Sequence, residues 1–167
     1  MGKVLAETFF KKNKLFLSTT RITQMILDKA PHVLIIDDDE INNYIATKLI
    51  DKLPYKAKVT TCLNGEVGLD YLNSCILNQL ELPDIILLDL NMPVMDGWEF
   101  LNVYKNSIVP SLNKNVIINI VTSSVYNIDM LKSATYSFVN RFVSKPLNTE
   151  LLKELFGQIQ HTNHSFS

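Results

Sequence analysis

The sequence predicts an α/β fold in which a doubly wound, five-stranded parallel sheet is covered by helices on both faces. Five short apolar runs alternate with stretches whose apolar residues recur at helical spacing. Some runs, such as Ile85 to Leu88, are apolar throughout, which is typical of a strand buried on both faces. In such sheets function lies at the carboxyl ends of the strands, so the residues that end each strand are the candidates for chemistry.

The five expected strands are the segments in which β-branched and aromatic residues gather. In chain order they are HVLIID (32–37), AKVTTCL (57–63), DIILLD (84–89), NVIINIVT (115–122) and SFVNRFVSK (137–145). The second is more polar than the others, so we expect it at an edge of the sheet.

The expected helices occupy the segments between and after the strands. They are 40–53, which ends before Pro54, then 65–80, 97–106, 128–134 and 148–160, the last with Asn148 as N-cap. The first two carry apolar residues at helical spacing, which supports the helix assignment: Ile41, Tyr44, Ile45, Leu49 and Leu53 in one, Val67, Tyr71, Leu72, Cys75 and Ile76 in the other.

Length and composition indicate one soluble globular domain. The chain has 167 residues, of which 47% are hydrophobic and 20% charged, and its formal net charge is -1. Nothing in this balance favours a nucleic-acid partner, and no apolar run is long enough for a membrane span. The two cysteines, Cys62 and Cys75, are too few and too widely spaced for a disulfide framework or a CxxC pair. We expect buried free thiols and a cytoplasmic location.

We expect three parts along the chain. Residues 1–30 are a basic N-terminal extension without a motif, expected to be poorly ordered, and Met25 is a candidate native start. Residues 31–161 form the folded domain, and 162–167 are a tail. His161 and His164 have a spacing that suits a metal, but two ligands in a polar segment are better explained as solvated side chains.

Polar side chains end four of the five strands. Asp37, Asp38 and Asp39 follow the first, Asp89 the third, Thr122 the fourth, and Lys145 with Pro146 the fifth. Crowded carboxylates repel one another unless a cation joins them, and hard oxygen ligands suit Mg²⁺.

Lys145 would then attract a phosphoryl oxygen, Thr122 would donate a hydrogen bond to another, and Asp89 would be the nucleophile. Each residue alone is explained equally well as a turn, cap or surface residue. The simple explanation would have to hold independently at four strand ends, which is much less likely than one shared site. We therefore favour a site that receives a phosphoryl group.

Four motifs together resemble the receiver domain of two-component response regulators, in particular the single-domain, chemotaxis-regulator type. They are VLIIDDDE, DIILLDLNMPVMDG, IVTSS and FVSKPL, and the resemblance spans about residues 32 to 160. The resemblance implies a flavodoxin-like fold with strand order 2-1-3-4-5.

It also implies roles for individual residues. Asp89 would be the phospho-acceptor, Asp38 would bind Mg²⁺ directly, and Asp37 would bind it largely through water. Asp89 itself and the backbone carbonyl of Asn91 would complete the metal ligands.

Thr122 and Lys145 would contact the phosphoryl oxygens, and the Lys145–Pro146 peptide bond would be cis. Phe142 stands at the position of a switch aromatic, and with Thr122 would change position on phosphorylation.

By this resemblance the protein is a response regulator in a phosphorelay, with no enzymatic activity beyond its own phosphorylation and dephosphorylation. Its partners would be a histidine kinase or histidine phosphotransfer protein and a downstream protein target, and weak homodimerisation is compatible with it. No output domain fits in the short tail after the last helix.

Three other classes of protein share parts of this pattern. A haloacid-dehalogenase-type phosphatase needs a second acid two residues after the nucleophile, where this chain has Asn91. A flavodoxin-like FMN binder needs a Ser/Thr-rich loop after the first strand, where the aspartates would repel a phosphate. A pseudo-receiver that acts as an interaction scaffold would normally have lost part of the Asp, Thr and Lys set, and it stays as the alternative.

Overall fold

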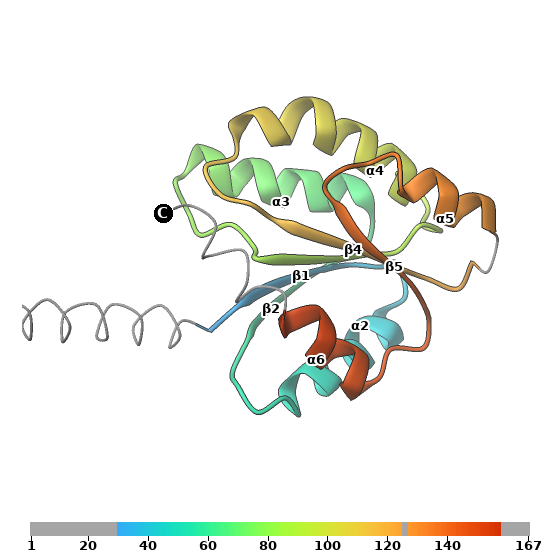
Figure 1. The fold of residues 1–167 in the computed structure, drawn as a ribbon. Coiled ribbons are helices and arrows are strands. Elements are labelled where there is room, and N and C mark those ends of the chain that lie inside the picture. The colour runs from blue at the N-terminus through green and yellow to red at the C-terminus, as the bar shows by residue number, and fades with distance from the viewer. Residues whose placement is uncertain (1–29, 125–126, 158–167) are drawn as a thin grey trace, which may run out of the picture. The chain divides into compact units, whose positions relative to one another are not determined.

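A computed structural model of the chain describes residues 30–124 and 127–157, and from Pro31 onward these belong to one compact unit. Five parallel strands form one sheet in the order β2-β1-β3-β4-β5 (Figure 1). The strands are β1 (His32–Ile36), β2 (Lys58–Cys62), β3 (Ile85–Leu88), β4 (Ile117–Thr122) and β5 (Val139–Ser144). The predicted fold class and strand order are confirmed, and the polar second strand lies at an edge as expected.

Helices cover both faces of the sheet (Figure 1). They are α2 (Glu40–Asp51), α3 (Gly65–Leu77), α4 (Gly97–Val103), α5 (Asn127–Ser133) and α6 (Thr149–Gly157), with a π-helical turn (Tyr104–Ile108) and a 3-10 turn (Val109–Ser111) continuing α4. One core lies between the sheet and α3 and α4, and the other between the sheet and α2 and α6.

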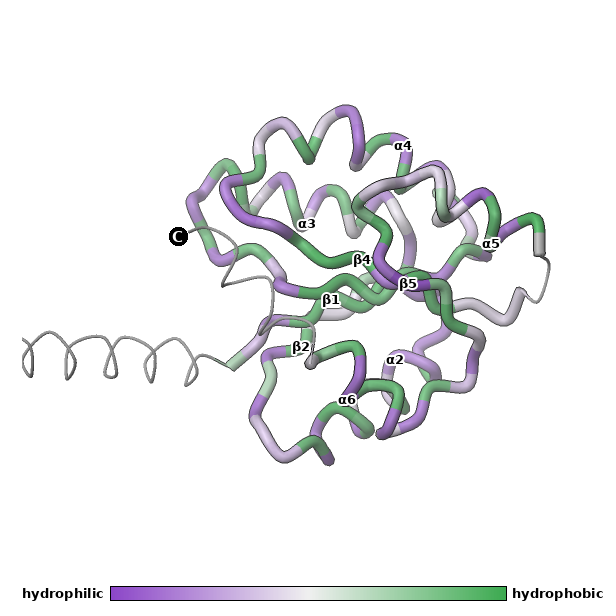
Figure 2. Tube along the Cα trace, viewed as in Figure 1, coloured by the Kyte–Doolittle hydropathy of each residue, from purple (hydrophilic) through white to green (hydrophobic). Residues whose placement is uncertain are grey.

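The central strands are buried because both of their faces are covered. Every residue of β1, β3 and β4 is buried, and these strands are largely hydrophobic in Figure 2. Successive residues alternate between the two cores: Leu34 and Ile36 pack on the α3/α4 side, Val33 and Ile35 on the α2/α6 side. The same alternation continues in β3 and β4, and it decides the direction of the side chains that follow each strand.

The apolar residues of the first expected helix are divided between the core and the surface. Ile41, Tyr44 and Ile45 are 67%, 63% and 48% exposed, whereas Asn43 and Ile50 are buried in α2. Apolar residues occur around more than one face of this helix, so periodicity alone did not fix its rotation. Packing against the sheet and α6 selected the face that includes Ile50 and the small Ala46.

The second expected helix buries a narrower set of its apolar residues. Leu72 of α3 is buried, and Cys75 is buried as expected, whereas Val67 is 46% exposed and the buried face includes Gly68. A Cβ at Gly68 would lie 2.6 Å from Cδ1 of Ile36, so the glycine lets α3 approach the sheet closely.

The helix ends follow from capping chemistry. Asn148 caps α6 as predicted, because its Oδ1 accepts a hydrogen bond from Leu151 N at 2.8 Å. Asp96 and Glu99 form a capping box at the start of α4. Both cysteines are buried and free, and burial raises the pKa of the Cys62 thiol to about 11.

Across residues 30–124 and 127–157, no helix has the length and apolar character that crossing a membrane requires. The predictions for residues 1–29, including Met25, and for His161, His164 and the tail lie outside the described residues.

Candidate functional site

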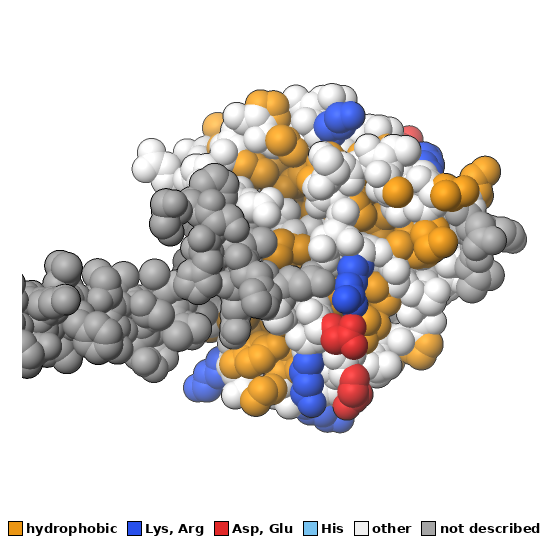
Figure 3. Space-filling view, in the orientation of Figure 1, with side chains coloured by type: hydrophobic (Ala, Val, Ile, Leu, Met, Phe, Trp, Pro, Cys, Tyr) orange, Lys and Arg blue, Asp and Glu red, His pale blue; other side chains and the backbone are white. Residues whose placement is uncertain are grey.

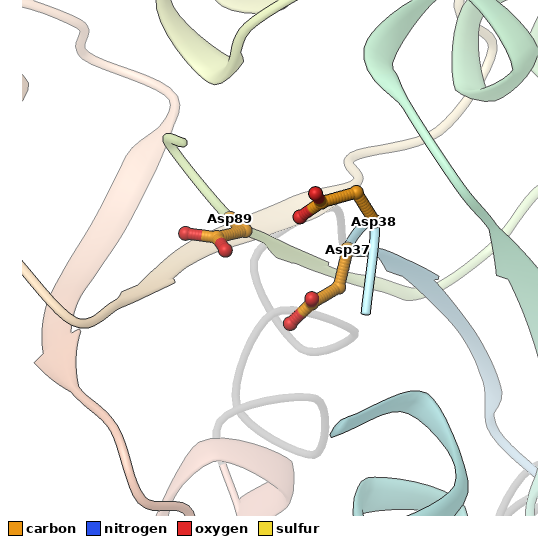
Figure 4. A group of neighbouring side chains, drawn as sticks. All are labelled: Asp37, Asp38 and Asp89. Carbon is orange, nitrogen blue, oxygen red and sulfur yellow. The ribbon is translucent and has the colours of Figure 1, made fainter. Parts of the chain in front are cut away.

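Three carboxyl groups lie together where β1 and β3 end. Asp37, Asp38 and Asp89 each offer an oxygen, and these oxygens lie within 4.8 Å of one another (Figure 4). Asp37 and Asp89 are each only 6% exposed, whereas Asp38 is exposed. The alternation along the strands places Asp37 and Asp89 on the α2/α6 side of the sheet.

Lys145 joins the two buried carboxylates. Its Nζ lies 2.7 Å from Oδ2 of Asp37 and 2.7 Å from Oδ2 of Asp89. Burial by itself would lower the pKa of Lys145, but the hydrogen bonds and charges of the two carboxylates outweigh it and raise that pKa. The ammonium group therefore holds together the ends of β1, β3 and β5.

The loop after β1 is fixed by two hydrogen bonds to Asp37. Its Oδ1 accepts from Asp39 N at 3.1 Å, and its backbone carbonyl accepts from Nδ2 of the buried Asn43 at 2.8 Å. The sequence interpretation did not identify Asn43 as part of the site. Its only signal was a polar residue within the first turns of an amphipathic helix.

The loop after β3 presents the Asp89 carboxylate in a fixed direction. The Oδ1 atom accepts hydrogen bonds from the backbone N–H groups of Leu90 (2.7 Å) and Asn91 (3.3 Å). The backbone N–H of Asp89 donates to Ile36 O at 2.8 Å, which ties this loop to β1. Further along, Val94 has a φ of 70°, a left-handed conformation that is strained for a β-branched residue.

Thr122 lies at the end of β4, fully buried, and contacts both neighbouring loops. Its Oγ1 accepts hydrogen bonds from Ser124 N at 3.2 Å and from Nδ2 of Asn91 at 3.4 Å. The Ser124 hydroxyl in turn donates to Asp129 in the first turn of α5. A chain of contacts therefore runs from the loop that follows Asp89 through Thr122 to α5.

Phe142 and Pro146 complete the set of predicted residues. Phe142 is half-buried in β5 opposite Ile120, and it packs on the α3/α4 core rather than on the carboxylate side. The Lys145–Pro146 peptide bond is cis. Asp37, Asp38, Asp89 and Lys145 thus form one cluster, Thr122 and Asn91 border it, and Phe142 lies on the other face of the sheet.

A pocket of about 160 Å³ opens beside the cluster, on its α2 side. Asp37, Asp89 and Lys145 line it together with Ile45 of α2 and Leu147. Three carboxylates, one of them exposed, are the hard oxygen donors that a small divalent cation such as Mg²⁺ prefers. The donor set therefore fits a magnesium ion with room for water or phosphate oxygens as further ligands.

Comparison with known proteins identifies the family. The family model described as the response regulator receiver domain matches residues 33–156. A solved two-component response regulator from Cytophaga hutchinsonii is 31% identical, with a TM-score of 0.73, and the match covers 80% of this chain and 98% of that one. The chemotaxis protein CheY4 of Vibrio cholerae, at 21% identity and a TM-score of 0.61, shares the fold over 78% of this chain and 99% of its own.

Curated relatives differ greatly in length. The probable methanogenesis regulatory protein FilR2 of Methanothrix harundinacea is 28% identical over 128 residues, which are 77% of this chain and 80% of that protein. A protein-glutamate methylesterase/protein-glutamine glutaminase of Desulfotalea psychrophila is 29% identical over 64% of this chain, but the match spans only 28% of that protein. The residues matched by the family model include the whole carboxylate cluster and Lys145, and the chain belongs to the response regulator receiver family.

Proposed function

We propose that this protein is a single-domain response regulator that accepts a phosphoryl group on Asp89 from a phosphohistidine and passes the signal on by a change of conformation. The observation that carries the proposal is the contact of one ammonium group, Lys145 Nζ, with both Asp37 and Asp89 at 2.7 Å. A buried cation between two carboxylates is well placed to offset charge when a phosphoryl group arrives. The single-domain form is supported by the Cytophaga regulator, 98% of whose chain is matched.

In the proposed reaction a carboxylate oxygen of Asp89 attacks phosphorus, the P–N bond to the donor imidazole breaks, and the imidazole nitrogen takes up a proton. Backbone N–H groups already hold Oδ1 of Asp89, so Oδ2, which faces Lys145, is the oxygen we assign to the attack. Lys145 would transfer its contact to a phosphoryl oxygen. Asp37, Asp38 and the backbone carbonyl of Asn91 would hold Mg²⁺, which supplies charge neutralisation when bound.

The proposed switch uses the contacts that extend from the site to α5. A new acceptor at Asp89 would draw the Thr122 hydroxyl away from its present neighbours. The hydrogen bond between Ser124 and Asp129 would carry that movement to α5. Phe142 would then turn further into the α3/α4 core. The output surface would be formed by α5, β5 and α6, and hydrophobic side chains on α5 are exposed there (Figure 3).

The phosphodonor would be a histidine kinase or histidine phosphotransfer protein that docks on α2. Ile41, Tyr44 and Ile45 form an exposed apolar group on this helix, and Ile45 also lines the pocket that contains Asp89. A donor helix on this group would bring its phosphohistidine to the pocket. A downstream protein target would read the output surface, and weak self-association is compatible with the same surface. The buried free thiols fit a reducing compartment such as the cytoplasm.

The test is intact-mass spectrometry after incubation with acetyl phosphate and Mg²⁺, for wild type and Asp89→Asn. We expect a labile gain of one phosphoryl group in wild type only, and none when the metal is chelated. Asp51→Asn, at an exposed carboxylate of α2 remote from the cluster, is the matched control and should be phosphorylated like wild type.

Rapid hydrolysis could hide the adduct, so beryllofluoride binding is measured in parallel as a stable phosphoryl mimic. Binding of the mimic with Mg²⁺ would support acceptance at Asp89 even without a visible adduct. Failure of both the adduct and the mimic would overturn the proposal and favour the pseudo-receiver scaffold.

A further inference from the structure

We propose that Asn43 is a positioning residue that fixes the peptide unit between Asp37 and Asp38 and thereby raises the affinity of the carboxylate cluster for Mg²⁺. Asn43 lies near the start of α2 and is only 5% exposed. Its Nδ2 donates a hydrogen bond of 2.8 Å to the backbone carbonyl of Asp37. Asn43 therefore acts on the site through the backbone, because the carboxylates themselves come from other residues.

The short loop between β1 and α2 is held at both ends by hydrogen bonds. Asp37 N donates to Cys62 O of β2 at 3.0 Å, and Asp37 Oδ1 accepts from Asp39 N at 3.1 Å. Asp39 in turn caps α2, and its backbone carbonyl accepts from Asn43 N at 3.0 Å. The bond from the Asn43 side chain to Asp37 O closes the loop and the first turn of the helix into a ring of hydrogen bonds, and Asp38 lies within this ring.

The direction of the Asp38 side chain depends on this ring more than on packing. Asp37 and Asp89 are buried, and Lys145 contacts both of them, whereas Asp38 is exposed. A peptide unit is planar, so a fixed carbonyl at Asp37 also fixes the direction in which the chain continues to Asp38. The hydrogen bond from Asn43 therefore decides from which point, and in which direction, the Asp38 side chain leaves the backbone.

Repulsion between the carboxylates opposes this arrangement as long as no cation joins them. One oxygen from each of Asp37, Asp38 and Asp89 lies within 4.8 Å of the others, and the Asp38 carboxylate points toward Asp89 in Figure 4. Like charges at this distance repel, and the exposed Asp38 could reduce the repulsion by turning to water. A loop that is held in place keeps the oxygens together before Mg²⁺ arrives, so binding does not have to order it.

An asparagine is a costly residue for a merely structural role at this position. Asn43, Ala46 and Ile50 are the buried residues of α2, and their spacing places them on one face of the helix. Among the residues that the structure describes, Oδ1 of Asn43 is buried without a hydrogen-bond partner, which carries a penalty in free energy. Leucine would avoid that penalty and is a better helix former. What leucine lacks is the donor, and to that donor we attribute the asparagine.

The inference deepens the proposed function and rests on it for the presence of Mg²⁺, so its first measurement is made without metal. Backbone order parameters from NMR report how rigidly the amide groups of Asp38 and Asp39 are held in the full chain. The affinity for Mg²⁺ is then measured by calorimetric titration, with no phosphodonor present. Urea unfolding separates an effect on the loop from an effect on the stability of the whole fold.

The variant is Asn43→Leu, and Thr47→Val is its matched control. Thr47 lies one turn later in α2, and its Oγ1 donates a hydrogen bond of the same length, 2.8 Å, to the backbone carbonyl of Asn43. Each substitution replaces a polar side chain by an apolar one of similar shape and removes one hydrogen bond to a backbone carbonyl. Only Asn43→Leu removes a bond to the loop that carries Asp37 and Asp38.

In Asn43→Leu we expect lower order parameters at Asp38 and Asp39 and a dissociation constant for Mg²⁺ raised about tenfold, as for the loss of other contacts that orient metal ligands. The unfolding free energy should stay close to that of wild type, because the unpaired acceptor Oδ1 of Asn43 is removed while Asp37 O loses this donor. A merely structural role predicts the reverse, which is a loss of stability with unchanged affinity. Thr47→Val should keep the order parameters and the Mg²⁺ affinity of wild type.

Unchanged order parameters or an unchanged Mg²⁺ affinity in Asn43→Leu would overturn the inference, as would an equal loss of affinity in Thr47→Val or a wild type that binds no Mg²⁺. A wild type that binds Mg²⁺ but takes neither phosphate nor beryllofluoride would overturn the proposed function, and the affinity of Asn43→Leu would still decide the role of Asn43. If Asn43→Leu does not fold, Asn43→Ala, which adds no atoms to the core, takes its place with the same expected loss of Mg²⁺ affinity.

Discussion

Replacing Lys145 by methionine should destabilise the protein far more than the loss of an ordinary ion pair. Methionine is also long and unbranched, but it carries no charge. The side chains of Lys145, Asp37 and Asp89 are only 14%, 8% and 7% exposed, so the substitution leaves two buried carboxylates without their cation. Removing one partner of a buried ion pair costs about 3–5 kcal/mol of unfolding free energy.

Lys114→Met provides a matched control. Lys114 Nζ lies 2.7 Å from Oδ1 of Asp84, the same distance as in the site, but its side chain contacts one carboxylate and the two are 30% and 22% exposed. Pairs that water reaches are worth about 0–1 kcal/mol. The same chemical change should therefore cost several times less at this position.

The assay is urea unfolding at neutral pH with and without Mg²⁺. We expect Mg²⁺ to stabilise Lys145→Met more than wild type, because in the variant the carboxylates have no ammonium group to compete with the metal. Equal losses for Lys145→Met and Lys114→Met, or an effect of Mg²⁺ that does not differ between Lys145→Met and wild type, would refute the reasoning.

Three further predictions concern the same region. In Gly97→Ala the new Cβ would lie 2.8 Å from Leu90 Cα and would overlap the Asp89 backbone carbonyl, so urea unfolding should show an unfolding free energy lower by about 1–3 kcal/mol. Gly157→Ala is the control, because its Cβ would have no atom within 4 Å and should leave the unfolding free energy unchanged; equal effects of the two substitutions would contradict this. Val94→Asn should raise the unfolding free energy by about 1 kcal/mol, because the side chain is exposed and a φ of 70° suits asparagine better than valine. A lower unfolding free energy in this variant would show that the turn is not strained. Burial lowers the pKa of Lys145, but the two carboxylates outweigh burial and raise that pKa above its ordinary value of 10.5, so the stabilisation from Lys145 is complete below about pH 10.5 and is lost as the pH rises through the folded value. The difference in unfolding free energy between wild type and Lys145→Met should therefore be constant near neutral pH and shrink only above about pH 10.5, and a decrease already at neutral pH would contradict this.

Much of the fold could be predicted because local sequence and the sheet architecture agree. The continuous apolar runs of β1, β3 and β4 match their burial on both faces, and the polar β2 lies at the edge. Parallel strands bring their carboxyl ends to one edge, so Asp37, Asp89 and Lys145 could be grouped before any distance was known.

The rotation of α2 and the role of Asn43 could not be predicted. The helix has apolar residues on more than one face, and only its contacts with the sheet and α6 show that Ile50 is buried while Ile41 and Tyr44 are exposed. Asn43 acts through a hydrogen bond to the backbone of Asp37, and a contact of that kind has no sequence pattern.

The sequence by itself determined which side chains end the strands, because a strand's length and its burial are properties of a local run of residues. The tertiary structure alone decided where those side chains point. In β5 the direction of Lys145 depends on one extra residue, and that residue can be recognised only from the pairing of β5 with β4. A shift of one residue reverses the face of every later side chain, so the geometry of this site depends on the non-local pairing of β5 with β4.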